Sequence, residues 1–201
     1  MWFRSEKIQS NPLIEKLLSN RKEVYGEAIK ALEHLDLLTK ESLVPPLKEA
    51  LKHRSKEIRK SAQWALGYLK ESAKEAIPAL IATLKDKHWE IRSGAEWALG
   101  EIGLDSKVAI PEIIRALKDK HPYVRNNAAM TLGKFGSTAQ EAVLPLIESL
   151  QDKDVYVRYW AALALGEIGS ESAIPALEKI LQDRDAGVSR NAQISLQKIK
   201  K

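Results

Sequence analysis

The sequence contains no cysteine and no long apolar run. Without a thiol, the chain forms neither a disulfide nor a thiolate zinc site, and it has neither a cysteine nucleophile nor a thioether attachment for a chromophore. No segment approaches the roughly 18 apolar residues of a membrane span, and the opening stretch MWFRSEKIQSNP lacks the apolar core of a secretion signal. We therefore expect a cytoplasmic protein that does not enter a membrane.

Charge of one sign is in only small excess. The 201 residues include 32 Lys plus Arg and 27 Asp plus Glu, for a formal net charge of +5. This excess indicates a nucleic acid or an acidic partner only if it is concentrated on one face. The sequence also lacks a phosphate-binding loop and the signature of a serine or threonine triad. We expect a protein that is not an enzyme and needs no cofactor or metal.

What the sequence does contain is a period of 33 residues. Leu-Gly pairs keep this step, and so do four prolines, while Pro145 comes one residue late and Pro175 thirty residues after it. The pairs begin at Leu66, Leu99, Leu132 and Leu165, and the prolines are Pro12, Pro45, Pro78 and Pro111. A fixed period of this length is typical of repeat proteins. We place six units, beginning near residues 12, 45, 78, 111, 145 and 175.

Each unit is expected to form two helices. The first has proline near its first turn, where the missing N–H costs little. The second ends at a glycine (Gly103, Gly136 or Gly169), which adopts the left-handed conformation without strain. Glycines inside the second helix, such as Gly100, cost up to about 1 kcal/mol relative to alanine, a cost that a closely packed neighbouring helix would offset. Since a helix pair cannot bury its apolar face alone, we predict an all-α, right-handed solenoid of stacked repeats.

We expect residues 1–201 to form a single domain with a capping repeat at each end. The N-terminal cap covers residues 1–44, where Trp2 and Phe3 could fold over the first repeat. Regular repeats cover 45–174, and the C-terminal cap covers 175–201. In this last helix, polar residues replace the small residues of internal repeats and predict an outward-facing surface; they are Gln193, Ser195 and Gln197.

Three segments carry a family resemblance: residues 157–183, the stretch HWEIRSGAEWALGEIG from residue 88, and HPYVRNNAAMTLGKFG from residue 121. They resemble HEAT-like repeats of the phycobilisome-lyase type, and the similarity extends over residues 45–183. Such repeats occur in bilin lyase subunits and in signalling scaffolds, so the resemblance specifies a fold more closely than a function. It implies that the protein is mainly a binding platform.

The resemblance also implies a structural role for the charged signature residues. In HEAT repeats, an aspartate six residues before an arginine forms hydrogen bonds that link one repeat to the next. Three pairs have this spacing: Asp86 with Arg92, Asp119 with Arg125, and Asp152 with Arg158. The second repeat has His53 in place of the aspartate, so we expect this ladder to be interrupted near Arg59.

Eight of the twelve aromatic residues occupy second-helix positions that the fold does not require to be aromatic. These positions should line the concave face of the solenoid. Trp and Tyr dominate interface hot spots, and each buries a large area. We predict a partner-binding surface there, so Trp97→Ala should leave the melting temperature nearly unchanged. The surface comprises Trp64, Trp89, Glu90, Trp97, Glu101, Asn126, Met130, Lys134, Tyr159 and Trp160. Alternatively, the rings lie between the helices as additional core.

These second-helix positions carry nearly equal numbers of basic and acidic residues, which disfavours a nucleic-acid groove. Our first hypothesis is a non-enzymatic scaffold, monomeric or weakly dimeric, that binds a protein or peptide. A bilin lyase subunit or chromophore chaperone is the alternative implied by the resemblance. A HEAT-like DNA glycosylase, with Glu96 beside Trp97 as its acid, or a DNA-binding protein has less support.

Basic residues gather in the loops that join the two helices of each unit. We expect them to form a stripe along the loop edge, which either keeps the protein soluble or contacts an acidic partner. The stripe comprises Lys85, Lys87, Lys118, Lys120 and Lys153.

Overall fold

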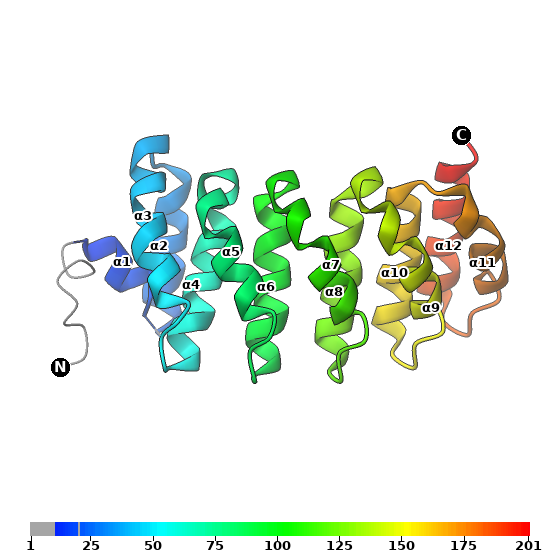
Figure 1. Ribbon diagram of the computed structural model, residues 1–201, viewed down its shortest axis with the longest axis horizontal. Helices are drawn as coiled ribbons and strands as arrows, with labels where there is room; N and C mark the ends of the chain where they lie inside the picture. Colours follow the sequence, from blue (N-terminus) through cyan, green and yellow to red (C-terminus); the bar gives the residue numbers. More distant parts are fainter. Residues whose placement is uncertain (1–10, 20) are drawn as a thin grey trace. The chain divides into compact units, whose positions relative to one another are not determined.

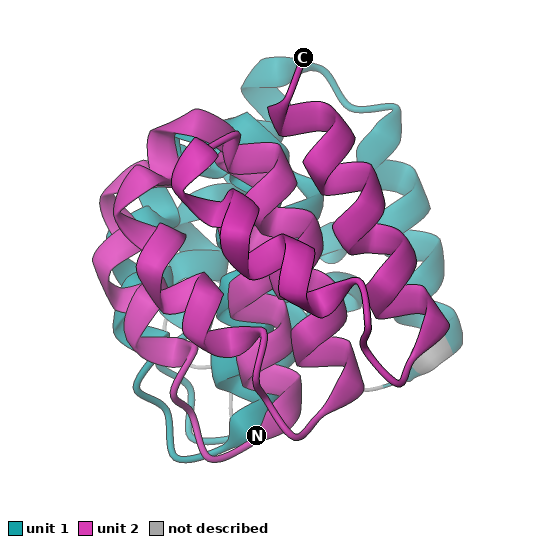
Figure 2. Cartoon of the chain, turned by 90° about the vertical axis from the view of Figure 1, so that its right-hand side faces the viewer, with its two compact units in different colours: residues 1–105 teal, residues 106–201 magenta. Residues whose placement is uncertain are grey.

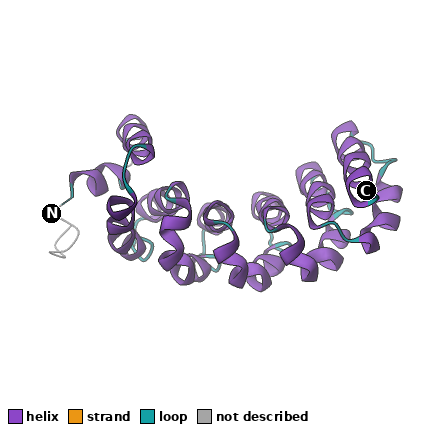
Figure 3. Ribbon diagram, turned by 90° about the horizontal axis from the view of Figure 1, so that it is seen from above, coloured by secondary structure: helices purple, strands orange, loops and turns teal. Residues whose placement is uncertain are grey.

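The structure, a computed structural model, describes residues 11–19 and 21–201, without the side chain of Lys22. Within these ranges the chain forms α-helices and short 3-10 helices but no strand (Figure 3), and no helix there is long and apolar enough to cross a membrane. The chain divides into two compact units, residues 1–105 and 106–201 (Figure 2). Trp2 and Phe3 lie outside the described residues. The single domain with two caps stays a prediction.

Unit 1 contains helices in pairs (Figure 1). The first members are α1 (Pro12–Leu17), α3 (Leu37–Ala50) and α5 (Ile77–Thr83), and the second members are α2 (Lys22–Glu33), α4 (Lys56–Tyr68) and α6 (Trp89–Ile102). A 3-10 segment, Lys70–Ala76, precedes α5. Helix α4 packs against α3 on one side and α6 on the other. Leucine and isoleucine side chains fill the space between these helices and are fully buried, among them Leu47, Leu66, Leu80, Ile91 and Leu99.

Unit 2 repeats the same arrangement. Its first helices are α7 (Ile110–Ala116), α9 (Val143–Ser149) and α11 (Ile174–Ile180), and its second helices are α8 (Pro122–Lys134), α10 (Val155–Ile168) and α12 (Ala186–Ile199). The 3-10 segments Leu104–Ala109, Gly136–Ala142 and Glu171–Ala173 precede the three first helices. Helix α10 packs between α8 and α12. The predicted fold class, an all-α solenoid of two-helix repeats, is confirmed.

Helix α3 begins earlier than the proline pattern predicts. Pro78, Pro111 and Pro175 lie in the first turn of their helices, as expected. Pro45, however, lies inside α3, which begins at Leu37. Asp36 caps this helix, because its carboxylate accepts a hydrogen bond of 2.9 Å from the backbone N–H of Thr39. Since no turn residue separates this cap from the proline, the helix begins at the cap.

The interior glycines permit close helix packing, as predicted. A Cβ on Gly133 of α8 would lie 3.1 Å from the Cα of Ala164 in α10. In unit 1, a Cβ on Gly67 would overlap the ring of Trp97. The cost of glycine inside a helix is therefore offset by contact with the neighbouring helix.

The glycines that follow the second helices have positive φ, as expected, but Gly103, with a ψ of −151°, lies outside the left-handed region that Gly169 occupies. Gly103, Gly136 and Gly169 have φ angles of 87°, 54° and 75°. Lys70 occupies the same place after α4, 33 residues before Gly103, and its φ is 51°. A side chain in this conformation costs roughly 1–2 kcal/mol, so Lys70 is a strained position in an otherwise regular pattern.

The last helix differs from its prediction at one residue. Gln193 and Gln197 are exposed, as a polar outer surface requires, but Ser195 is 1% exposed. Its side chain packs on Gly166 of α10, and its hydroxyl donates a hydrogen bond of 2.8 Å to the carbonyl of Ala162. The prediction that Ser195 faces outward is wrong, because a small polar side chain with a backbone partner fits this inter-helix contact.

The signature arginine of helices α4, α8 and α10 links two turns. In unit 2, the Nε and Nη2 atoms of Arg125 lie 2.7 and 2.8 Å from the carboxylate of Asp152, one repeat further on. Arg158 and Asp183 form the same bidentate pair at 2.8 and 2.9 Å. The Nη1 atom of Arg125 donates to the carbonyl of Asp119 at 2.9 Å. Asp152 thus offers its carbonyl to Arg158 of its own repeat and its carboxylate to Arg125 of the preceding one.

Unit 1 shows the same bonds around Arg59. This guanidinium pairs with Asp86, with Nε 3.0 Å from Oδ2, and donates to the carbonyl of His53 at 2.8 Å. The expected interruption near Arg59 is therefore wrong. His53 contributes its backbone carbonyl, which does not depend on the side chain. Arg92 donates in the same way to the carbonyl of Asp86 at 2.9 Å.

Candidate partner-binding face

The second helices of unit 1 bring three aromatic rings together. The ring of Trp64 in α4 lies 4.5 Å, centre to centre, from that of Trp97 in α6. Tyr68, one turn after Trp64, lies 5.4 Å from Trp97 in an edge-on arrangement and 6.4 Å from Trp64. Such distances are typical of interacting aromatic pairs. The predicted site residues Trp64 and Trp97 therefore belong to one cluster.

Trp97 has both a surface and a packing role. Its side chain is half-buried, and its ring occupies the space above Gly67 where a side chain would otherwise lie. The sequence left open whether the rings form a surface or fill the gap between helices. The ring of Trp97 fills part of the gap above Gly67 and also contributes to the surface. An unchanged melting temperature for Trp97→Ala is therefore no longer expected.

A pocket of about 430 Å³ lies beside this cluster. Its lining combines aromatic rings from α2 and α4 with a few polar groups: Ser19, Tyr25, Glu57, Lys60, Ser61, Trp64 and Tyr68. The Tyr25 hydroxyl is buried and has no hydrogen-bond partner within the described part of the chain. Burial, with a smaller contribution from Tyr68, raises the pKa of Tyr25 well above its usual value. The phenol thus stays protonated at neutral pH and can donate to a ligand.

The charged groups at this pocket are of both signs. The carboxylate of Glu57 accepts a hydrogen bond of 2.7 Å from the Ser55 hydroxyl, which lowers the pKa of Glu57. Lys60 is exposed on the same helix. The pocket is therefore mostly aromatic, with a buried donor and one charge of each sign at its surface. Such a site suits an apolar or aromatic side chain followed by a hydrogen-bond acceptor.

Unit 2 has a corresponding pocket of about 360 Å³ on its second helices. It is lined by Met130, Gly133, Lys134, Gly136, Trp160, Leu163, Ala164 and Glu167. Three predicted site residues, Met130, Lys134 and Trp160, therefore share this pocket. Tyr159, the residue before Trp160, meets its ring edge-on at 5.4 Å. Glu167 is held in an ion pair with Lys198 of α12.

The other predicted site residues lie outside these two pockets. Trp89 begins α6 and is half-buried, as is Glu101 near the end of the same helix. Glu90 forms an ion pair of 2.8 Å with Lys56 of α4. Asn126 is only 8% exposed and offers little surface to a partner.

Glu96 does not fit the role of a catalytic acid. Its side chain is 0% exposed, although its neighbour Trp97 is half-buried. A general acid must come within hydrogen-bond distance of its substrate. The buried carboxylate therefore gives the glycosylase hypothesis no support.

The predicted site residues did not include Tyr25, Ser19, Ser61 and Glu57, which line the pocket of unit 1. Tyr25 was the hardest to find, because the first repeat departs from the pattern that aligns the others. Helix α2 has no arginine in its signature position, so the repeat pattern does not align its side chains with those of the other second helices.

Paired helices with repeated interhelical contacts define the class of the protein, an α-solenoid repeat protein. The sequence profile of HEAT repeats matches residues 10–100, 78–144 and 110–197. The chain therefore belongs to the HEAT-repeat family. No curated protein matches it.

Several solved structures share this fold. The designed armadillo repeat protein YIII(Dq.V1)4CPAF, in complex with peptide (KR)4, is 23% identical, with a TM-score of 0.73 over 93% of this chain and 98% of that one. The complex of CpcE and CpcF of phycocyanin lyase from Nostoc sp. PCC7120 is 26% identical, with a TM-score of 0.66 over 76% and 63%.

The karyopherin Kap121p, bound to the extreme C-terminus of the protein phosphatase Cdc14p, is 20% identical with a TM-score of 0.72. The match covers 90% of this chain but 22% of the karyopherin. These likenesses show the repeat fold.

Proposed function

We propose that this protein is a non-enzymatic scaffold that binds a segment of a partner protein on the face made by its second helices. The observation that carries the proposal is the aromatic pocket of unit 1, which Trp64 and Tyr68 line together with Tyr25, whose hydroxyl is a buried hydrogen-bond donor. Aromatic side chains at such positions dominate binding energies in protein interfaces.

Two of the similar structures support this proposal through what they bind. The designed armadillo protein holds a peptide, (KR)4, and Kap121p holds the C-terminus of another protein. By analogy, the pocket of unit 1 would hold an apolar or aromatic anchor residue, and the Tyr25 hydroxyl would donate to a neighbouring peptide carbonyl. The pocket of unit 2 would hold an anchor residue of its own against Met130 and Trp160. A cytoplasmic location, a monomeric or weakly dimeric state and the lack of nucleic-acid binding stay predictions.

Selection from a displayed library of random twelve-residue peptides, followed by fluorescence anisotropy on the selected peptides, tests the proposal. We expect Trp64→Ala to weaken binding at least about thirtyfold, because a hot-spot residue contributes 2 kcal/mol or more. Tyr25→Phe, which removes only the hydroxyl, should weaken binding roughly threefold to tenfold through loss of one hydrogen bond.

Tyr156→Ala is the matched control, because Tyr156 is 62% exposed and lies outside both pockets. Its binding should equal that of the wild type. If the selected peptides bind Trp64→Ala and wild type alike, or if Tyr156→Ala weakens them as much, the pocket of unit 1 is not the binding site.

The similarity to the CpcE–CpcF complex favours a second candidate, a bilin-handling role. The aromatic pocket of unit 1 would then hold part of a tetrapyrrole without a covalent bond, since the chain has no cysteine. Mixing the purified protein with phycocyanobilin and recording the absorption spectrum separates the candidates. A shifted visible band that Trp64→Ala abolishes would favour the bilin role, whereas an unshifted spectrum agrees with the scaffold.

A further inference from the structure

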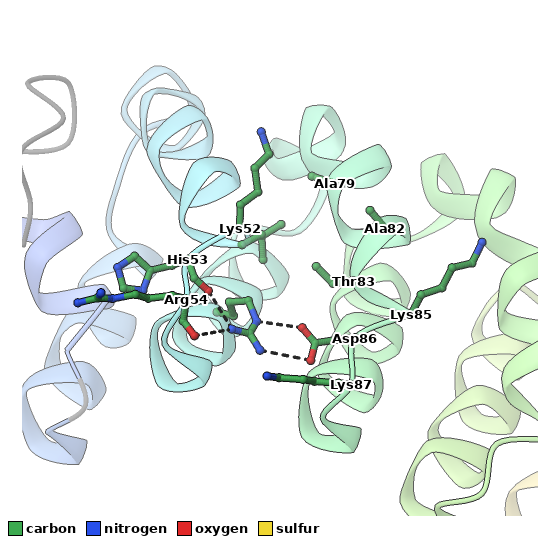
Figure 4. Close-up of a pocket in the computed structure, with 11 residues that line it drawn as sticks. Lys52, His53, Arg54, Ala79, Ala82, Thr83, Lys85, Asp86 and Lys87 are labelled. Carbon is green, nitrogen blue, oxygen red and sulfur yellow. Dashed lines mark hydrogen bonds and ion pairs between the residues drawn. The ribbon is translucent and has the colours of Figure 1, made fainter.

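A second hollow of unit 1 shares no residue with the aromatic pocket. It has a volume of about 660 Å³ and lies between the loop after α3 and the helix α5 with its following loop (Figure 4). We call it the loop groove. Its lining residues are Leu51, Lys52, His53, Arg54, Arg59, Ala79, Ala82, Thr83, Lys85, Asp86 and Lys87.

The loop groove concentrates positive charge. Five lining residues are cationic, whereas Asp86 is the one anionic residue among them. One of the five, Lys52, forms an exposed ion pair of 3.1 Å with Glu49, which does not line the groove. The Asp86 carboxylate is already bound by Arg59, whose Nε and Nη2 atoms lie 3.0 and 3.2 Å from its two oxygens. Its charge is therefore neutralised within the groove. The chain as a whole has a net charge of only +5, so a large part of its excess lies at this one place.

The positive charge depends on His53. In the later repeats, the equivalent residue is aspartate, and its Oδ1 atom accepts a hydrogen bond from the backbone N–H two residues further on. These bonds are 2.9 Å at Asp86, 2.8 Å at Asp119, 2.8 Å at Asp152 and 2.9 Å at Asp183. In the second repeat, the Nδ1 atom of His53 accepts the same bond from Ser55 at 3.0 Å. The imidazole thus keeps the turn without a carboxylate charge.

Loss of the carboxylate at residue 53 does not disturb the arginine ladder. A ladder aspartate binds the guanidinium of the preceding repeat, as Asp86 binds Arg59. Helix α2 of the first repeat contains no arginine. No guanidinium of that helix therefore needs a carboxylate at this place.

Small residues on α5 give the loop groove its space. Ala79 and Ala82 line it, and in the view of Figure 4 they lie between the side chains of Lys52 and Lys85. At the same places on α7, 33 residues later, stand Glu112 and Arg115, which form an ion pair with each other. The surface of α5 therefore lacks both the side-chain volume and the carboxylate that α7 presents at the equivalent positions.

We infer that the loop groove is a docking site for an acidic peptide segment of a partner protein. Carboxylates of the segment would lie against the cations at the rim, Lys52, Arg54, Lys85 and Lys87, and their aliphatic stems would contact Ala79 and Ala82. A phosphate backbone fits less well, because it needs a continuing track of cations. This inference does not depend on the proposed function.

Fluorescence anisotropy of a labelled octaglutamate peptide at low ionic strength tests the inference. His53→Asp restores the residue of the other repeats, so the turn and the melting temperature should be unchanged. One added negative charge in the groove should weaken octaglutamate binding roughly threefold to tenfold. Lys52→Glu with Lys87→Glu should weaken it by more than about tenfold, and raising the salt to 0.5 M should weaken wild-type binding strongly.

Lys118→Glu with Lys153→Glu, the equivalents of Lys52 and Lys87 two repeats later in unit 2, is the matched control and should bind octaglutamate nearly as well as the wild type. Trp64→Ala should also bind it normally, which separates this site from the proposed peptide-binding face. The inference is overturned if His53→Asp has wild-type affinity or if the unit 2 variant loses as much as the unit 1 variant. It is also overturned if octathymidylate binds more tightly than octaglutamate, since the groove would then prefer phosphates.

Discussion

The contact between Trp97 and Gly67 predicts that the effect of one substitution reverses with the other. In the wild type, a methyl group at Gly67 would overlap the indole ring. Overpacking of this kind costs typically 1–3 kcal/mol, so Gly67→Ala should destabilise the protein. In a Trp97→Ala background the ring is gone, and the same methyl group enters the vacated space. There, Gly67→Ala should stabilise the protein by up to about 1 kcal/mol, through the higher helix propensity of alanine.

The single change Trp97→Ala should itself be destabilising. Removing a fully buried Trp costs about 3–5 kcal/mol. Because Trp97 is half-buried, we expect a loss of about 2–3 kcal/mol, including its ring contacts with Trp64 and Tyr68. In a chain of this size, that corresponds to a fall in melting temperature of about 4–12 °C.

Chemical denaturation of the four proteins of this double-mutant cycle measures the coupling between the two residues. We expect a coupling energy of about 1–4 kcal/mol, the difference between the effects of Gly67→Ala in the two backgrounds. If Gly67→Ala destabilises both backgrounds equally, the ring does not lie over Gly67. If Trp97→Ala melts with the wild type, the side chain is wholly at the surface, as the sequence alone suggested.

Two further predictions concern the Arg–Asp ladder and the strained residue Lys70. A hydrogen bond from Arg158, partly opposed by burial, lowers the pKa of Asp183. Because the pKa in the folded state is below the unfolded value near 4, the contribution of Asp183 to the unfolding free energy is present above pH 4 and is lost as the pH falls. Asp183→Asn should cost about 2 kcal/mol at pH 7, and in urea titrations its deficit should shrink below pH 4; a deficit that is constant down to pH 2 would contradict the ion pair. Lys70→Gly should raise the unfolding free energy by about 1 kcal/mol, because glycine adopts the positive φ without strain. Gly103→Ala, the control, should lower the unfolding free energy. A destabilised Lys70→Gly would show that Lys70 is not strained.

The fold could be predicted from the sequence because its determinants recur every 33 residues. Leu66 and Leu99 are fully buried, as the period requires, and Gly103 and Gly169 have positive φ. The exceptions are places where a local signal competes with the repeat. The Asp36 cap starts α3 before the proline, and Ser195 finds a backbone partner inside the structure.

The candidate site was harder to predict, because periodicity identifies the variable positions but not their contacts. Trp64 and Trp97 occupy equivalent positions 33 residues apart, and the structure brings their rings together. Tyr25 comes from the irregular first repeat, so the period did not single it out. Likewise, His53 looked like a break in the ladder, since sequence alone does not show which bonds use the side chain and which the backbone.

The ladder has a consequence for how such chains lengthen and for how they can be redesigned. A 33-residue segment cut at a fixed point of the regular repeats carries one ladder arginine and one ladder aspartate, and Arg125 and Arg158 both find their carboxylates in the following repeat. Duplicating such a segment within a unit leaves no guanidinium unmatched, whereas deleting a fraction of one leaves an orphaned charge. Because the charges pair between repeats rather than within them, insertions of whole repeats preserve every ladder pair.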